Sequence, residues 1–162
     1  MSGAHATARA RRPVAATLAV ALLGACGLTG PRAAADATVA SYAVTADGIV
    51  APLDGRVGDA VRGRALIVAR GAANCVLCHA IPDPELRFAG DVGPSLAGIG
   101  ARLTPAQLRL RVVDMQALAP RTPMPSYHRV AGLADVAPAW RGRPLLTAGE
   151  VEDIVAYLST LR

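Results

Sequence analysis

The sequence has few aromatic residues and no lysine. Five of its 162 residues are aromatic, and all 17 basic residues are arginine, which we interpret as a compositional bias. Aromatic side chains normally supply much of a core's buried area, and a chain of this length indicates one domain. A large, planar, buried cofactor would supply what the side chains lack.

An export signal is predicted over residues 1–35. Three arginines within the first 12 residues are followed by an apolar run at residues 14–26. This run is too short to cross a bilayer comfortably, and small residues that suit signal-peptide cleavage precede Asp36. We therefore expect the mature protein in the periplasm.

A second cleavage site competes with the first. Leu23-Gly24-Ala25-Cys26 resembles a bacterial lipobox, and a cut before Cys26 would leave a lipidated residue at the new N-terminus. The match has low specificity, because any leader rich in Ala and Gly that ends in Cys satisfies it. Only on this alternative do we expect contact with a membrane, as a lipid anchor that faces the periplasm.

The net charge of +5 does not indicate a nucleic-acid partner. Four of the 17 arginines precede Asp36, whereas all 12 acidic residues lie at or after it. The remainder therefore has 13 arginines against 12 acids, a net charge of +1. So small a charge is no sign of a surface that binds phosphate backbones, and we expect no nucleic-acid partner.

Cysteine and histidine are too few for a structural zinc site. Such a site needs four ligands, usually as two separated pairs, and beyond the leader the chain offers Cys75, Cys78, His79 and His128. Neighbouring Cys78 and His79 cannot easily both bind one ion. A thioredoxin-like pair would follow a strand, which no pattern before Cys75 predicts. A disulfide between the two cysteines would close a very short loop and stabilise little.

The order Cys-x-x-Cys-His predicts one covalent haem c. On one turn of helix, residues three apart reach neighbouring positions, so Cys75 and Cys78 can form thioethers to the two vinyl groups of one porphyrin. The following His79 then lies beneath the ring, with a nitrogen directed at the iron. We expect the two cysteines to attach the haem and His79 to be a metal ligand.

The second metal ligand is to be chosen among Met115, Met124 and His128. Met115 lies on the apolar face of a predicted helix, so core packing explains it. Met124 stands between two prolines, which stiffen its loop. We predict Met124, with His128 or an open position as alternatives; otherwise His128 is a partly exposed loop residue. A methionine ligand raises the reduction potential.

Three helices are predicted. The first begins at the N-cap residue Asp59 and should end near Gly71. Capping boxes, Thr104 with Gln107 and Thr147 with Glu150, begin the other two. The second helix should end at Pro120. The apolar faces of the three helices consist of Val61, Ala65 and Val68; of Leu108, Val112, Met115 and Ala119; and of Val151, Ile154, Val155, Leu158 and Leu161.

The helices are separated by long loops. Residues 82–103 and 121–146 are irregular, and the first stretch is rich in Pro and Gly. No alternating strand pattern occurs in residues 59–162. These features predict an all-α domain over 59–162, with short helices around one haem. We interpret residues 36–58, which show no clear period, as an N-terminal extension.

This arrangement resembles a class I cytochrome c. That family has a helix before Cys-x-x-Cys-His, a Gly-Pro-x-Leu loop, a Met-bearing loop and a closing helix, matched here by residues 75–79, 93–96, 123–125 and the segment from Thr147. The resemblance implies that the carbonyl of Pro94 accepts a hydrogen bond from His79 and fixes its tautomer.

It also implies that Gly63 or Ile67 packs against Tyr157, where the first and last helices cross.

A narrower resemblance rests on three segments. NCVLCHAIPDPELRFAGDVGPSLAGIGARL, TPMPSYHRV and LLTAGEVEDIVAYLSTLR are similar to SoxX, the family of monohaem cytochrome subunits in bacterial thiosulfate-oxidising complexes. The similarity covers residues 59–162. The lipobox departs from the soluble periplasmic pattern of that family, which leaves the location open.

The resemblance to SoxX implies an enzyme complex with a larger cytochrome subunit, SoxA. The complex would act as an L-cysteine S-thiosulfotransferase, which oxidatively joins thiosulfate to a cysteine of the carrier protein SoxYZ. This chain would accept the electrons and pass them to a downstream acceptor, without catalysing the sulfur chemistry itself. The alternative is a free-standing periplasmic electron carrier.

Overall fold

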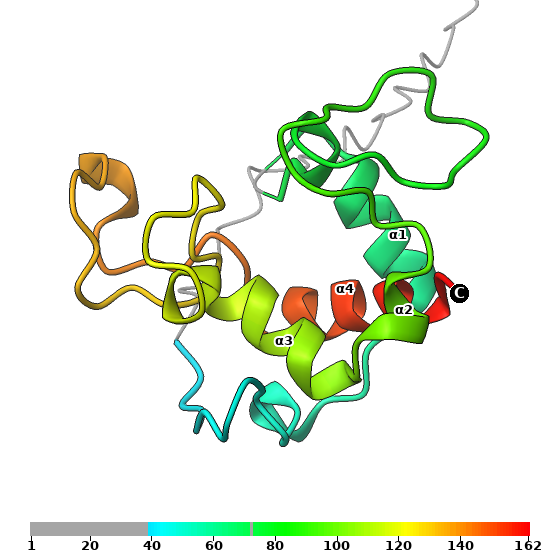
Figure 1. Ribbon diagram of the computed structural model, residues 1–162. Coiled ribbons are helices and arrows are strands. Elements are labelled where there is room, and N and C mark those ends of the chain that lie inside the picture. Colours follow the sequence, from blue (N-terminus) through cyan, green and yellow to red (C-terminus); the bar gives the residue numbers. More distant parts are fainter. Residues whose placement is uncertain (1–38, 72) are drawn as a thin grey trace, which may run out of the picture. The chain divides into compact units, whose positions relative to one another are not determined.

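Helices joined by irregular segments make up the part of the chain that the computed structural model describes, residues 39–71 and 73–162 (Figure 1). The α-helices are α1 (Ala60–Val68), α2 (Ile99–Arg102), α3 (Pro105–Asp114) and α4 (Ala148–Thr160). In these residues the only β-pairing is an isolated bridge between Thr45 and Gly48. The all-α prediction is confirmed. The predicted signal peptide lies outside the described residues.

Asp59 caps α1 as predicted. Its carboxylate accepts hydrogen bonds from the backbone N–H groups of Val61 and Arg62, at 2.8 and 3.0 Å. The helix ends at Val68, earlier than the glycine at position 71 indicated. The predicted inward face is wrong, because Val61 is 80% exposed and the buried residues of α1 are Gly63 and Ile67.

The buried face of α1 crosses α4 at very short range. A Cβ atom on Gly63 would lie 1.9 Å from the carbonyl oxygen of Asp153 and 2.9 Å from the Cβ of Tyr157. Only a glycine permits this approach, because real Cβ atoms never come so close to backbone. The contact between Gly63 and Tyr157 is the one that the family resemblance implied.

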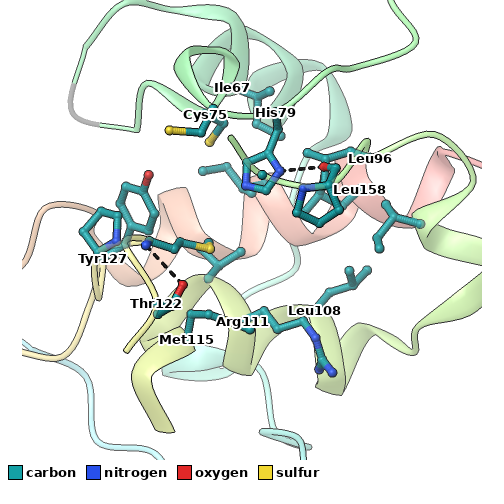
Figure 2. Close-up of a pocket in the computed structure, with 18 of the residues that line it drawn as sticks. Ile67, Cys75, His79, Leu96, Leu108, Arg111, Met115, Thr122, Tyr127 and Leu158 are labelled. Atoms are coloured by element: carbon teal, nitrogen blue, oxygen red, sulfur yellow. Dashed lines mark hydrogen bonds between the residues drawn. The ribbon is translucent and has the colours of Figure 1, made fainter. Parts of the chain in front are cut away.

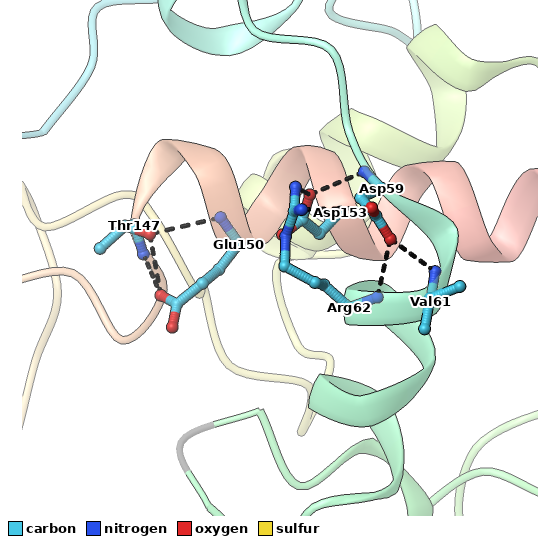
Figure 3. Close-up of polar contacts among 6 residues, drawn as sticks. All are labelled: Asp59, Val61, Arg62, Thr147, Glu150 and Asp153. Atoms are coloured by element: carbon cyan, nitrogen blue, oxygen red, sulfur yellow. Dashed lines mark hydrogen bonds and ion pairs between the residues drawn. The ribbon is translucent and has the colours of Figure 1, made fainter.

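An ion pair joins the same two helices. The guanidinium of Arg62 donates from Nε and Nη2 to the two carboxylate oxygens of Asp153, at 2.7 and 2.8 Å (Figure 3). The backbone N–H of Asp59 donates to the same carboxylate at 2.7 Å. Since these hydrogen bonds favour the charged form, they hold the pKa of Asp153 below its ordinary value.

Both predicted capping boxes are present. The hydroxyl of Thr147 accepts from the N–H of Glu150 at 3.3 Å, and the Glu150 carboxylate accepts from the N–H of Thr147 at 2.8 Å (Figure 3). Thr104 and Gln107 form the corresponding pair at the start of α3. These bonds satisfy backbone donors that would otherwise lack partners.

Two boundaries differ from the prediction. The α-helical part of the second helix ends at Asp114, and a 3-10 turn over Met115–Ala117 replaces the expected continuation to Pro120. The stretch expected to be a loop before Thr104 contains α2, which is only four residues long. Such a helix has too few residues for a period to mark it in the sequence.

Residues before α1 are built into the core. Ile49 and Leu53 are each 1% exposed. A buried ion pair between Arg109 of α3 and Glu152 of α4, at 2.7 Å, lies next to them. Arg109 also donates to the carbonyl of Ile49, and Glu152 accepts from the N–H of Leu53. The hydrogen bonds complete the partners of both charges, as burial demands.

No helix in the described residues is long and apolar enough to cross a membrane.

Candidate functional site

The cysteine–histidine segment, which follows α1 in the chain, forms a tight turn. A 3-10 helix spans Cys75–Leu77. The carbonyl of Cys75 accepts hydrogen bonds from the N–H groups of Cys78 and His79, at 3.1 and 2.9 Å. Cys75 and Cys78 are both free thiols. The turn brings both cysteines and His79 to the lining of one pocket.

His79 is held by the hydrogen bond that the family resemblance implied. Its Nδ1 lies 2.7 Å from the carbonyl oxygen of Pro94 (Figure 2). Because a carbonyl can only accept, Nδ1 carries the proton, and the Nε2 of the neutral ring keeps its lone pair. That lone pair is the form in which an imidazole binds a metal.

Gly93 makes this hydrogen bond sterically feasible. A Cβ at that position would lie 2.3 Å from Cε1 of His79. A Cβ on Gly90 would lie 1.9 Å from the carbonyl oxygen of Leu77. The N–H groups of these glycines donate to the carbonyls of Cys78 and Val76, at 2.8 and 2.9 Å. The loop after the turn therefore folds back tightly against it.

The pocket beneath the turn is apolar. Its volume is about 300 Å³, at the lower end of cofactor and ligand sites, about 300–1,000 Å³. α1, α3 and α4 supply aliphatic walls, and no carboxylate is among the lining residues that the structure describes. The walls include Ile67, Leu96, Ile99, Leu103, Leu108, Val112, Leu146, Ile154 and Leu158.

Both methionines beyond the leader reach this pocket. Met124 lines it together with the two prolines beside it, and its N–H donates to Oγ1 of Thr122 at 3.2 Å. Met115 also lines the pocket, half-buried, at the end of α3. Core packing was predicted for Met115, and its side chain in fact forms part of the pocket wall. Met124 remains our predicted metal ligand.

A hydrogen bond from Tyr127 joins the loop that carries Met124 to the segment just before Cys75. Its hydroxyl donates to the carbonyl of Ala73, two residues before Cys75, at 2.7 Å. The ring is buried and lines the pocket. Burial raises the pKa of Tyr127 well above that of a free tyrosine. Sequence reasoning missed this residue, because one tyrosine in a loop has no period that assigns it a partner.

His128 is buried, contrary to the expected partial exposure. It is 0% exposed and is not part of the pocket's lining. Its Nε2 accepts from the N–H of Ala40 at 3.0 Å, and its Nδ1 lies 2.8 Å from the carbonyl oxygen of Leu146. Both ring nitrogens are therefore occupied by backbone groups, which argues against His128 as the alternative metal ligand.

The thiol of Cys75 is held in its neutral form by its surroundings. Burial raises its pKa to about 11, because a buried thiolate loses the solvation that stabilises its charge. A neutral, buried thiol is a weak nucleophile, which argues against Cys75 as a cysteine that cycles between thiol and disulfide.

A solved structure places the chain in a family. The chain is similar to a chain in the crystal structure of SoxXA from P. pantotrophus, with 32% sequence identity and a TM-score of 0.68, over 74% of this chain and 93% of that one. The chain belongs to the SoxX family. Comparisons with family models and with curated proteins gave no match.

The pocket fits the cofactor of a SoxX-family cytochrome. It combines the thiols of Cys75 and Cys78, the imidazole of His79 with its free Nε2, and the thioether of Met124. Aliphatic side chains surround these groups. These donors match the attachment and axial ligation of haem c. In the described residues, no group of three or more Cys, His, Asp and Glu side chains could hold a metal ion by itself.

Proposed function

We propose that this chain is the electron-accepting c-type cytochrome subunit of a SoxXA-like, thiosulfate-oxidising complex in the periplasm. The observation that carries the proposal is the meeting of Cys75, Cys78, His79 and Met124 in one apolar pocket, in a chain of the SoxX family.

Each of these side chains has a separate role in holding haem c. Cys75 and Cys78 would form the thioethers, and Nε2 of His79 and the sulfur of Met124 would bind the iron. The bound haem supplies one-electron chemistry, with iron alternating between ferric and ferrous states. The thioether of Met124 would favour the ferrous state, and aliphatic side chains would surround the haem. Pro94 holds the tautomer of His79 through its carbonyl.

The sulfur chemistry takes place on the partner subunit. Joining thiosulfate to a protein thiol releases one proton and two electrons, as the new S–S bond forms. Among the lining residues that the structure describes, this pocket has no carboxylate to act as a base. We therefore assign the L-cysteine S-thiosulfotransferase reaction to the complex, with a SoxA-like subunit and a SoxYZ-like carrier. This chain takes the electrons, one at a time, to a downstream acceptor.

Exposed apolar side chains favour a complex over the alternative, a free-standing electron carrier. Leu77, Phe88 and Val92 are 65%, 83% and 70% exposed. They lie on the cysteine turn and on the loop that folds back against it, and Val92 also lines the pocket. Large apolar side chains exposed on neighbouring segments favour a site of protein association here.

The function is tested with the full chain, exported in a host that attaches haem c. We expect a Soret band, retained in the Cys26→Ser control and lost when Cys75 and Cys78 are both changed to Ser. We also expect stable association with a SoxA-like cytochrome, and reduction by thiosulfate and carrier only when that partner is present. A haem protein that stays monomeric and is not reduced under these conditions would be the free-standing carrier instead.

Substitution of each methionine in turn tests which of them is the axial ligand. Met124→Ala should lower the reduction potential and open the ferrous iron to carbon monoxide, because it removes the thioether ligand. Met115→Ala shortens a side chain in the same pocket and should do neither. If Met115→Ala produces these changes and Met124→Ala does not, the assignment of Met124 is wrong.

A further inference from the structure

The loop that carries Met124, residues 121–129, is attached to the end of α3; we call it the methionine loop. The helix ends at Asp114, so the carbonyls of its last turn lack partners within the helix. The N–H of His128 donates to one of them, the carbonyl of Val113, at 3.2 Å. The second half of the methionine loop therefore lies against the last turn of α3.

A buried carboxylate strengthens this attachment. Asp114 and Ser126 are both buried. The hydroxyl of Ser126 donates to Oδ1 of Asp114 at 2.6 Å, and Nε of Arg129 lies 2.8 Å from Oδ2. Arg129 also donates from Nη2 to the hydroxyl of Ser126, at 3.2 Å. Both oxygens of the carboxylate thus hold side chains of the methionine loop, and these partners compensate its buried charge.

The backbone between this anchor and Met124 is short and stiff. Ser126 lies two residues after Met124, and the residue between them is Pro125. Proline fixes its own φ and restricts the residue before it. A displacement of Ser126 would therefore move Met124 as well, so the contacts of Ser126 with Asp114 control where the thioether lies.

A thioether depends most on such an anchor when the iron is ferric. Thioether sulfur favours ferrous iron, so its bond to ferric iron is the weaker one. Retention of the sulfur in the ferric state then depends more on the loop that presents it. A competing ligand binds only to molecules in which the sulfur has left, and its apparent affinity is proportional to that open fraction.

We propose that Asp114 is a positioning residue, which keeps the sulfur of Met124 on ferric iron by holding Ser126 and Arg129. The proposal rests on the proposed function, which supplies the haem and the Met124 ligand. It assigns to a carboxylate outside the pocket the control of a bond inside it.

The test is a titration of the haem-loaded ferric protein with imidazole. Asp114→Asn removes the charge and directs an amide N–H at the guanidinium of Arg129. The loss of one charge-assisted hydrogen bond corresponds to about tenfold in an equilibrium constant. We therefore expect imidazole to bind ferric Asp114→Asn about tenfold more tightly than the ferric wild type. The red absorption band of sulfur-ligated ferric haem should weaken, while carbon monoxide binding to the ferrous protein should change less.

Asp153→Asn is the matched control. The two carboxylates are equally buried, with side chains 10% and 9% exposed, and their arginines lie at 2.8 and 2.7 Å. Asp153, however, joins α4 to Arg62 of α1 and makes no listed hydrogen bond or ion pair to the methionine loop in the described residues. This variant should lose stability as well, but should keep the imidazole affinity and the red band of the wild type.

Two outcomes would overturn the proposal. One is an equal imidazole affinity in Asp114→Asn and the wild type. The other is an equal rise in Asp114→Asn and Asp153→Asn, which would show general loosening of the domain. If Asp114→Asn does not incorporate haem, Ser126→Ala decides in the same titration, because it removes the hydroxyl and leaves the charges in place; an unchanged affinity would then refute the role of Asp114.

Failure of the proposed function has a different signature. A wild type without a Soret band would refute the haem site. A ferric wild type that binds imidazole as tightly as Met124→Ala would refute Met124 as the ligand.

Discussion

Replacing Gly63 by alanine should separate α1 from α4. The added Cβ would lie 1.9 Å from the carbonyl oxygen and 2.5 Å from the carbonyl carbon of Asp153. The obstacle is helix backbone, which cannot rotate away as a side chain can. One helix must therefore shift, and the ion pair between Arg62 and Asp153 across the same crossing is strained with it.

The expected change in the free energy of unfolding is the difference between two opposing effects. Overpacking a close contact costs about 1–3 kcal/mol, and backbone obstacles belong at the upper end. Alanine is favoured over glycine inside a helix by about 1 kcal/mol. We expect Gly63→Ala to lower the free energy of unfolding by about 2 kcal/mol. That loss corresponds to a fall in the melting temperature of about 6–12 °C for a domain of this size.

The assay is denaturation of the haem-loaded protein by heat and by guanidinium, followed by circular dichroism. Gly71→Ala is the control, because a Cβ on Gly71 would meet nothing within 4 Å and its backbone is not left-handed. We expect this control to change stability by less than about 0.5 kcal/mol. If Gly63→Ala has the same melting temperature as the wild type, the close crossing of the helices is refuted.

Two further predictions concern the imidazole and the acid stability of the domain. Gly93→Ala places a Cβ 2.3 Å from the His79 ring, so the ring must move from the Pro94 carbonyl. Absorption spectra should then show reduced haem incorporation. Unchanged spectra would contradict the close contact. The pKa of Asp153 is lowered, chiefly by its hydrogen bonds from Arg62, so its stabilisation is present above the unfolded pKa of about 3.9 and is lost as the pH falls through the lower, folded pKa. Asp153→Asn should therefore destabilise the domain by about 1–2 kcal/mol at neutral pH, with urea denaturation showing that the difference from the wild type shrinks below about pH 4; a difference independent of pH would exclude this linkage.

Local signals in the sequence predicted the starts of three helices. Asp59, Thr104 and Thr147 each cap the helix that follows, because capping depends on side chains within a few residues of the backbone they bond. The spacing of Cys75, Cys78 and His79 likewise placed them on one turn, since the turn is a local structure. The pocket that this turn borders was expected from the motif alone.

Features that depend on a distant partner could not be predicted from residue patterns. The outward direction of Val61 follows from the close approach of Gly63 to α4, and a glycine carries no apolar signal. The burial of His128 depends on Ala40 and Leu146, which lie 88 and 18 residues away. The hydrogen bond between His79 and Pro94 was expected only by resemblance to a family.

The buried ion pair between Arg109 and Glu152 has a consequence for the order of assembly. Residues 49–53 precede every α-helix in the described residues, yet the groups that receive them come from α3 and α4. The segment therefore depends on side chains from two helices that follow it by more than 50 residues. Such long separations along the chain slow folding. Residues 49–53 leave the ribosome before the α-helices, but their hydrogen bonds to Arg109 and Glu152 can all form only after residue 152 has been added to the chain.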